Sequence, residues 1–195
     1  MPIKWPLNSP GIIPIFATSS SGANPQLQFF ENFPGHLGVN VAVRSNGILS
    51  IHAVNIPLSL SFNYPVVLVS RPDSGGTQTI QFGLFSLNGS TFSLANSASQ
   101  SIGFSNAASW ITLVTSATQN ISPGAWYFAI NAFSSGTSNL SFYINSSVSP
   151  ENAQPVFIMG RMTETTNAMP GSIATSGLDI TGSDATRQPY IILTA

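Results

Sequence analysis

The sequence contains no cysteine and very little charge. Its 195 residues include 5 lysines and arginines, of which Lys4 is the only lysine, and 6 aspartates and glutamates. Charged residues make up 6% of the chain, against about 25% in an ordinary soluble domain. The absence of cysteine excludes disulfides, iron–sulfur clusters and thiolate zinc sites. With a net charge of −1, the chain cannot form the basic surface that binds phosphates, so we expect no nucleic-acid partner.

Long hydrophobic runs are also missing. No apolar run approaches the roughly 18 residues of a membrane-spanning helix, and we expect no membrane insertion. The chain is nevertheless 43% apolar and 10% aromatic, which is far too apolar for a disordered segment. Its polar character comes from neutral side chains, because the sequence has 30 serines, 15 threonines and 16 asparagines. These numbers predict a folded domain with a surface of hydroxyls and amides.

Strand patterns recur along the chain, and sustained helical periodicity does not. Apolar and polar residues alternate over 58–62, 80–84 and 140–144, as in strands with one buried face. Segments 39–43 and 48–51 read as a strand pair joined by a turn at Asn46-Gly47. Continuous apolar runs are typical of strands covered on both faces; these runs are 66–69, 126–130, 156–159 and 190–193.

Turn residues separate these strands. Asn88-Gly89 predicts a two-residue hairpin between 82–87 and 91–95, because this dipeptide suits the two positive-φ positions of a type I′ turn. Pro123-Gly124 predicts a second turn. Strands at short intervals with turns between them predict an all-β fold, an antiparallel β-sandwich of the jelly-roll kind.

Two regions depart from this pattern. Residues 1–35 carry six of the 14 prolines and predict an extended N-terminal arm, followed by a sandwich domain over 36–195. Residues 162–189 are polar and predict a long surface loop before the last strand. The apolar residues of the arm are candidates for an assembly interface: Trp5, Ile12, Ile13, Ile15, Phe16, Phe29 and Phe30.

Catalytic and metal-binding patterns are weak. His36 and His52 are the only histidines, and no Gly-x-Ser-x-Gly motif marks a nucleophile. The six carboxylates lie mostly beside turn residues rather than in facing pairs. Asp179 and Asp184 place oxygen ligands at short spacing, but the segment lacks the glycine and closing glutamate of a calcium loop. We therefore expect no enzyme activity, no cofactor and no metal, and the sequence names no ligand-binding residue.

Four aromatic residues could stack on a sugar ring or could belong to the core. They are Trp110, Trp126, Tyr127 and Tyr143. Consecutive residues of a strand point to opposite faces. Trp126 and Tyr127 must therefore point to opposite sides of their sheet, and the sequence does not decide which of them faces outward.

The shortage of charge itself indicates assembly. Near-zero net charge with high apolar content favours association, so we expect part of the surface to be buried in a homo-oligomer. We expect that loss of residues 1–30 would weaken the oligomer and leave the sandwich folded. The alternative is a monomer coated with serine and threonine hydroxyls.

Three stretches carry a resemblance to a known class of protein. They are residues 81–94, residues 121–130 with Pro-Gly-Ala-Trp-Tyr at 123–127, and residues 169–183 followed by Pro-Tyr-Ile at 189–191. In style and order they resemble the small β-sandwich or jelly-roll proteins of tailed-phage virions, of the tail-fibre, receptor-binding or capsid-decoration kind. The resemblance covers residues 80–195, and the first 35 residues have no counterpart in it.

The resemblance implies a non-enzymatic structural protein at the virion surface. Such a protein would form a homo-oligomer, most simply a trimer, would contact other virion proteins and would serve host attachment, with contact to a host glycan. Two other hypotheses stay open from the residues alone. A secreted or cell-surface carbohydrate-binding module would use exposed tryptophans such as Trp110 or Trp126, and a hydrolase built on a jelly roll would depend on His36 or His52.

Overall fold

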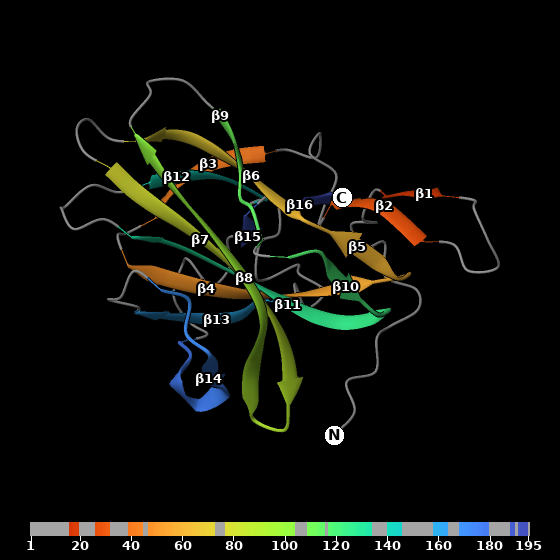
Figure 1. Cartoon of the computed structure of the whole chain (residues 1–195). Helices are drawn as coiled ribbons and strands as arrows, with labels where there is room; N and C mark the ends of the chain where they lie inside the picture. Colours follow the sequence, from red (N-terminus) through yellow and green to blue (C-terminus); the bar gives the residue numbers. More distant parts are fainter. Residues whose placement is uncertain are drawn as a thin grey trace.

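The structure is a computed structural model of the whole chain (Figure 1). The ranges that it describes are 16–19, 26–31, 39–44, 47–72, 77–103, 109–115, 117–133, 140–145, 158–163, 168–179, 188–189 and 191–194. Within these ranges the chain forms 16 strands and one short 3-10 turn, η1 (Thr175–Gly177). The described residues include no helix long and apolar enough to span a membrane. The expected all-β fold is therefore confirmed.

A six-stranded antiparallel sheet forms one layer of the molecule. Its strand order is β13-β4-β11-β7-β8-β14. The long hairpin of β7 and β8 runs the length of the molecule and projects beyond the other strands (Figure 1). The strands are β4 (Ile48–Ile56), β7 (Thr77–Asn88), β8 (Thr91–Gly103), β11 (Gly124–Phe133), β13 (Ile158–Thr163) and β14 (Ser172–Ala174).

A ten-stranded sheet forms the second layer. Its main path is β10-β5-β2-β16-β6-β12-β15, and β1, β3 and β9 pair onto β2, β12 and β6. All its pairings are antiparallel except a single parallel contact between β2 and β5. The strands are β1 (Phe16–Ser19), β2 (Gln26–Glu31), β3 (Val39–Arg44), β5 (Leu60–Phe62), β6 (Tyr64–Pro72), β9 (Ser109–Thr112), β10 (Gln119–Ile121), β12 (Leu140–Asn145), β15 (Gln188–Pro189) and β16 (Ile191–Thr194).

The two sheets share an apolar core, which we call the inner cluster. Phe82 of β7 lies at its centre, with its ring edge-on to Phe62 of β5 at 6.5 Å and to Phe128 of β11 at 5.5 Å. The buried members of the cluster are Val54, Ile56, Leu60, Phe62, Ile80, Phe82, Leu84, Ala98, Leu113, Ile121, Phe128, Ile130, Ala132, Ile191 and Leu193. Residues of both sheets meet here, as expected of a sandwich. The finer jelly-roll topology stays a prediction.

The hairpin predicted at Asn88-Gly89 is confirmed, with its turn one residue further along. Asn88 pairs with Thr91 and closes the ladder, so the two loop residues are Gly89 and Ser90. Gly89 has a φ of 61°, a conformation that costs glycine little. Glycine in the first loop position is typical of a type II′ turn, which serves two-residue hairpins as well as type I′ does.

The strand pair predicted across Asn46-Gly47 is wrong. Both strands exist, but β3 pairs with β12 in the ten-stranded sheet and β4 pairs with β11 and β13 in the six-stranded sheet. Gly47 has a φ of 72°, and its N–H donates to the carbonyl of Ala132 at 3.0 Å. The turn therefore passes the chain from one layer to the other. The Asn-Gly sequence favours a turn at this point of the chain, but it does not determine which strands pair with each other.

The central strands of the six-stranded sheet are buried on both faces. This agrees with the apolar run at 126–130, because Tyr127, Phe128, Ala129 and Ile130 are all buried. The half-exposed strand expected over 80–84 is wrong, since Gln81 is only 1% exposed. Residue 81 is polar, yet it lies on a face that another part of the chain covers.

Part of the expected N-terminal arm lies in the ten-stranded sheet. β1 pairs with β2, and β2 pairs in turn with β16 and β5. Phe16 lies in β1, and Phe29 and Phe30 lie in β2. Trp5, Ile12, Ile13 and Ile15 lie outside the described residues. A deletion that tests the arm should therefore stop at residue 15, because removing residues 16–30 would also remove paired strands.

Phe82→Ala tests the inner cluster. Removal of a fully buried phenyl ring that contacts two other rings should lower the free energy of unfolding by about 3–5 kcal/mol. Val114→Ala is the control, because Val114 is 58% exposed, and it should change stability by less than about 0.5 kcal/mol. Chemical denaturation measures both. Equal effects of the two substitutions would contradict the assignment of Phe82 to the core.

Candidate functional site

A segment of the chain folds across the outer face of the six-stranded sheet. We call residues 168–179 the strap. At one sheet edge its strand β14 pairs with Thr91–Ser93 of β8, and its Asp179 forms an antiparallel bridge with Arg161 of β13 at the opposite edge. The surface loop predicted over 162–189 is thus wrong for these twelve residues, because the strap is hydrogen-bonded and packed.

The strap covers a second apolar cluster, which we call the outer cluster. Ile173 of the strap is 3% exposed within it, and Met169 and Leu178 pack against its margin. On the sheet side, the rings of Phe92 and Tyr127 meet edge-on at 4.8 Å. The buried members are Leu49, Ile51, Ala53, Phe85, Phe92, Tyr127, Ala129 and Ile173. This face of the six-stranded sheet is therefore covered by the chain itself.

A close approach at Gly83 seats the strap. A Cβ at this position would lie 2.6 Å from a ring carbon of Phe85 and 2.8 Å from Cγ of Met169. Cβ atoms do not approach other atoms this closely, so only glycine lets the Met169 side chain lie against β7. The absence of a side chain at one strand position thereby sets how near the strap comes to the sheet.

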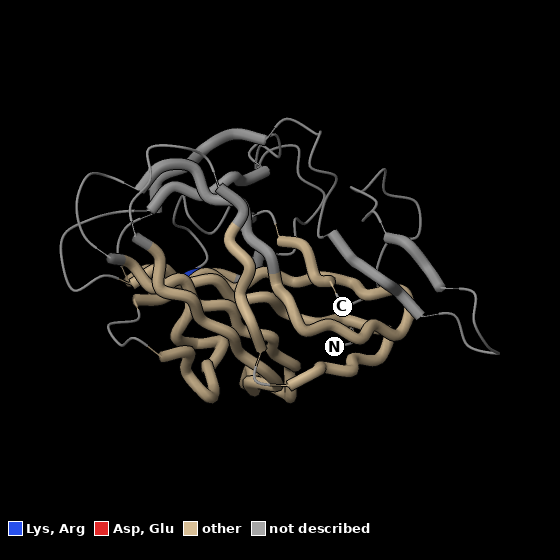
Figure 2. The backbone as a smooth tube through the Cα atoms, turned by 45° about the horizontal axis from the view of Figure 1, so that its top comes forward, with Lys and Arg blue, Asp and Glu red and all other residues tan. Residues whose placement is uncertain are grey.

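An ion pair fastens the other end of the strap. Nε of Arg161 lies 3.0 Å from Oδ2 of Asp179, and the two side chains are 29% and 44% exposed. Two backbone hydrogen bonds join the same residues, at 3.0 and 2.8 Å. These are the only charged residues whose side chains the structure describes, and the described backbone is tan almost throughout in Figure 2. Among the side chains that the structure describes, the positive charge and the negative charge therefore lie side by side.

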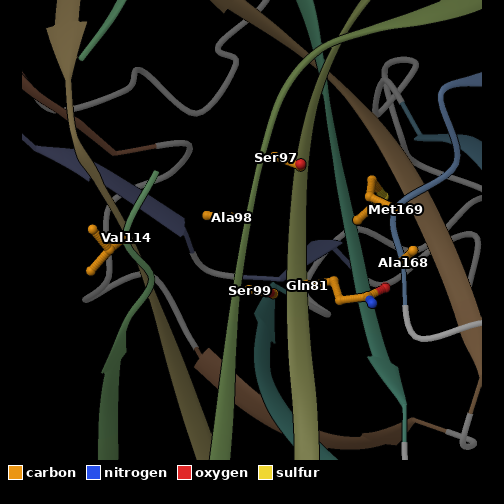
Figure 3. Close-up of a pocket in the computed structure, with 7 residues that line it drawn as sticks. All are labelled: Gln81, Ser97, Ala98, Ser99, Val114, Ala168 and Met169. Atoms are coloured by element: carbon orange, nitrogen blue, oxygen red, sulfur yellow. The ribbon is translucent and has the colours of Figure 1, made fainter. Parts of the chain in front are cut away.

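A groove of about 420 Å³ lies at the edge of β8, beside the first residues of the strap. Figure 3 shows its lining, with Ala168 and Met169 from the strap on one side and Val114 on the other. Between them are Gln81 of β7 and residues 97–99 of β8. Ala98 faces the inner cluster, so strand alternation directs the side chains of Ser97 and Ser99 to the outer face.

The polar side chains of the groove are uncharged. Asn131 donates from Nδ2 to Oε1 of Gln81 at 3.1 Å, and both residues are buried. Ser97 and Ser99 are exposed. Two residues further along β8, the hydroxyl of Ser101 lies 3.1 Å from that of Thr79. The groove therefore offers hydroxyl and carboxamide groups on a sheet face, beside the apolar side chains of Met169 and Val114.

The aromatic pair singled out in the sequence belongs to the packed interior. Trp126 is half-buried, packs against the inner cluster and donates from Nε1 to the carbonyl of Ser122 at 2.9 Å. Tyr127 lies in the outer cluster, and burial raises the pKa of its hydroxyl. Neither ring is left as a flat exposed platform for a sugar. Trp110 and Tyr143 lie in β9 and β12.

The candidate catalytic and metal residues do not form a site among the described residues. Nε2 of His52 lies 2.8 Å from Oγ of Ser50, but His52 is 1% exposed and Ser50 is fully buried. Asp179 is held by Arg161, and Asp184 and His36 lie outside the described ranges. No group of three metal-ligating side chains occurs within those ranges.

Sequence reasoning missed the residues of the groove. Ser97 and Ser99 are two of 30 serines, and nothing local distinguishes them. Gln81, which lies between Ile80 and Phe82, was the available signal, because a polar residue there needs a polar partner if the face is covered. The groove depends on the strap, whose position comes from contacts far apart in the sequence.

Comparison of the chain with protein-family models, with curated proteins and with solved structures finds no match. What can be said of function therefore comes from the residues and the geometry of this chain.

Gly83→Ala tests the seating of the strap. The added methyl group should force Phe85 and Met169 apart and lower the free energy of unfolding by about 1–3 kcal/mol. Gly171→Ala, also beside β8, is the matched control, because a Cβ there meets nothing within 4 Å. We expect the control to change stability by less than about 0.5 kcal/mol. Thermal or urea unfolding that finds the two variants equal would show that the strap is seated differently.

Proposed function

We propose that the protein is a non-enzymatic structural subunit of a phage virion, which forms a homo-oligomer on the particle surface as a fibre or decoration protein. The observation that carries this proposal is the scarcity of charge in the whole chain, which has 6% charged residues and a net charge of −1. Among the side chains that the structure describes, the two charged ones, Arg161 and Asp179, pair with each other. Charge on surfaces and sheet edges normally keeps β-proteins apart. Copies of this chain can approach one another over its described surface with little electrostatic repulsion.

The structure changes which residues we expect to make the contacts. The outer face of the six-stranded sheet is taken up by the strap, so it is not the surface that meets a neighbour. Among the side chains whose exposure the structure describes, the exposed large hydrophobic ones are Tyr64 and Val114. We assign the apolar contact between subunits to the N-terminal residues Trp5, Ile12, Ile13 and Ile15, which are apolar and precede the first described strand.

Burial of the one serine–histidine pair also supports a structural role over hydrolysis. His52 and Ser50 lie within the sheet interior with at most 1% exposure. A nucleophile and its base must reach a substrate, and this pair lies away from the surface. The hydrolase alternative would have to place its chemistry on His36.

Deletion of residues 1–15 tests the proposal. Because the deletion spares every described strand, the shortened chain should stay folded and should dissociate at protein concentrations at which the full chain stays associated. Sedimentation velocity measures the shift, and circular dichroism confirms the β-structure.

A matched full-length variant separates the apolar side chains from chain length. Ile12→Ser, Ile13→Ser and Ile15→Ser together should weaken association as the deletion does, whereas Val114→Ser on the described surface should leave association unchanged. If the deletion and the triple variant associate as tightly as the unaltered chain, the assigned interface is wrong.

A further inference from the structure

The groove at the edge of β8 has the chemistry of a ligand site rather than of an assembly surface. Its volume of about 420 Å³ falls in the range of roughly 300–1,000 Å³ that is typical of small-molecule sites. The hydroxyls of Ser97 and Ser99 can each donate and accept, and the carboxamide of Gln81 belongs to a buried pair with Asn131 that fixes its position. Two exposed hydroxyls thus lie on one concave surface, and the buried Gln81 is held in place behind them by Asn131.

The charge of the groove selects a neutral ligand. The described residues that line it are all uncharged. The described cation, Arg161, is paired with Asp179 at the opposite edge of the sheet. A phosphate, carboxylate or ammonium group would lose hydration here without gaining an opposite charge. A neutral ligand with several hydroxyl groups would keep its hydrogen bonds.

The groove also has two kinds of wall. Its floor carries the serine hydroxyls, whereas the thioether of Met169 and the isopropyl group of Val114 flank it from opposite sides (Figure 3). A pyranose ring has the same division, because its rim carries hydroxyls and its faces carry C–H groups. A purely apolar ligand would cover the hydroxyls of Ser97 and Ser99 without accepting or donating a hydrogen bond, and that has a cost.

An extended peptide fits the groove less well. Peptides usually bind to sheets by adding a strand to an unpaired edge. The edge of β8 is already engaged on both sides of the groove, by Thr115 opposite Ala98 and by β14 opposite Thr91–Ser93. The carbonyl of Gly171 also accepts from the N–H of Leu94 at 2.9 Å. The polar groups that remain are side chains on the sheet face.

We propose that this groove, formed by Gln81, Ser97, Ser99, Val114 and Met169, binds a neutral saccharide as a single pyranose unit. The site would give the proposed surface subunit a ligand, and it contains none of the N-terminal residues assigned to assembly. Saccharide binding and oligomerisation can therefore fail separately.

NMR titration of the full-length protein tests the proposal. The probes are glucose, galactose, mannose and N-acetylglucosamine, with glucuronic acid as the charged counterpart of glucose. We expect at least one neutral sugar to bind saturably, with a dissociation constant of about 1 mM or below, and to shift the Gln81 side-chain amide and the backbone amides of Ser97 and Ser99. Glucuronate should bind at least about tenfold more weakly than the neutral sugar.

Variants on one strand provide the matched control. Ser97→Ala combined with Ser99→Ala removes both hydroxyls and should weaken sugar binding about tenfold or more. Ser101→Ala lies on the same strand and face but outside the groove lining, and it should leave affinity within about twofold. All three serines are exposed, so both proteins should fold, and thermal unfolding checks this.

Four results would overturn the proposal. They are the absence of saturable binding by all four neutral sugars, binding that the double serine variant retains, glucuronate binding as tight as glucose binding, and groove shifts produced by a neutral serine-glycine peptide but by no sugar. Sedimentation velocity of the Ser97→Ala/Ser99→Ala variant distinguishes failure of the saccharide site from failure of the assembly proposal, because these substitutions should not change the oligomeric state.

Discussion

The structure depends on covering both faces of the six-stranded sheet. β4, β7 and β11 carry apolar side chains on alternate sides, so that one set of residues packs in the inner cluster and the other in the outer cluster. The ten-stranded sheet covers the first set. The strap covers the second, fastened at β8 by strand pairing and at β13 by Asp179. A sheet of this kind is stable in water only if both coverings are in place, since burial of apolar area is the main force that favours folding.

The chain carries few charged residues, and the described ones help to hold the strap in place. The ion pair of Arg161 and Asp179 closes the strap onto the sheet edge. Hydroxyls and amides provide the other polar side chains at the surface among those that the structure describes. Such a surface binds water well but repels neighbours weakly. It is therefore compatible with close packing of identical chains, and a neutral concave site on it discriminates against ions. The assembly role and the saccharide site that we propose both draw on this one property.

Local patterns in the sequence predicted the strands, and long-range contacts decided their partners. Gly89 lies in a turn as expected, because its positive φ is a local requirement. Gly124 also has a positive φ, and it begins strand β11 after a bend at Pro123. The strands at 39–43 and 48–51 do not pair with each other, because β3 pairs with β12 in the ten-stranded sheet and β4 pairs with β11 in the six-stranded sheet. Gln81 was expected at a half-exposed position and is buried, since the chain returns over it almost ninety residues later. Nothing in the sequence around Ser97 and Ser99 predicted that they line a groove, because the groove forms only where Met169 and Val114 lie beside them in the folded chain.

The solution mass of the unaltered protein tests the central claim most directly. Light scattering coupled to size exclusion, over a dilution series, measures it without any probe or variant. The account predicts a persistent species near three times 20.5 kDa, or a larger closed assembly. A 20.5 kDa monomer at every concentration would contradict it, and would mean that the neutral hydroxyl surface serves to keep a single chain in solution.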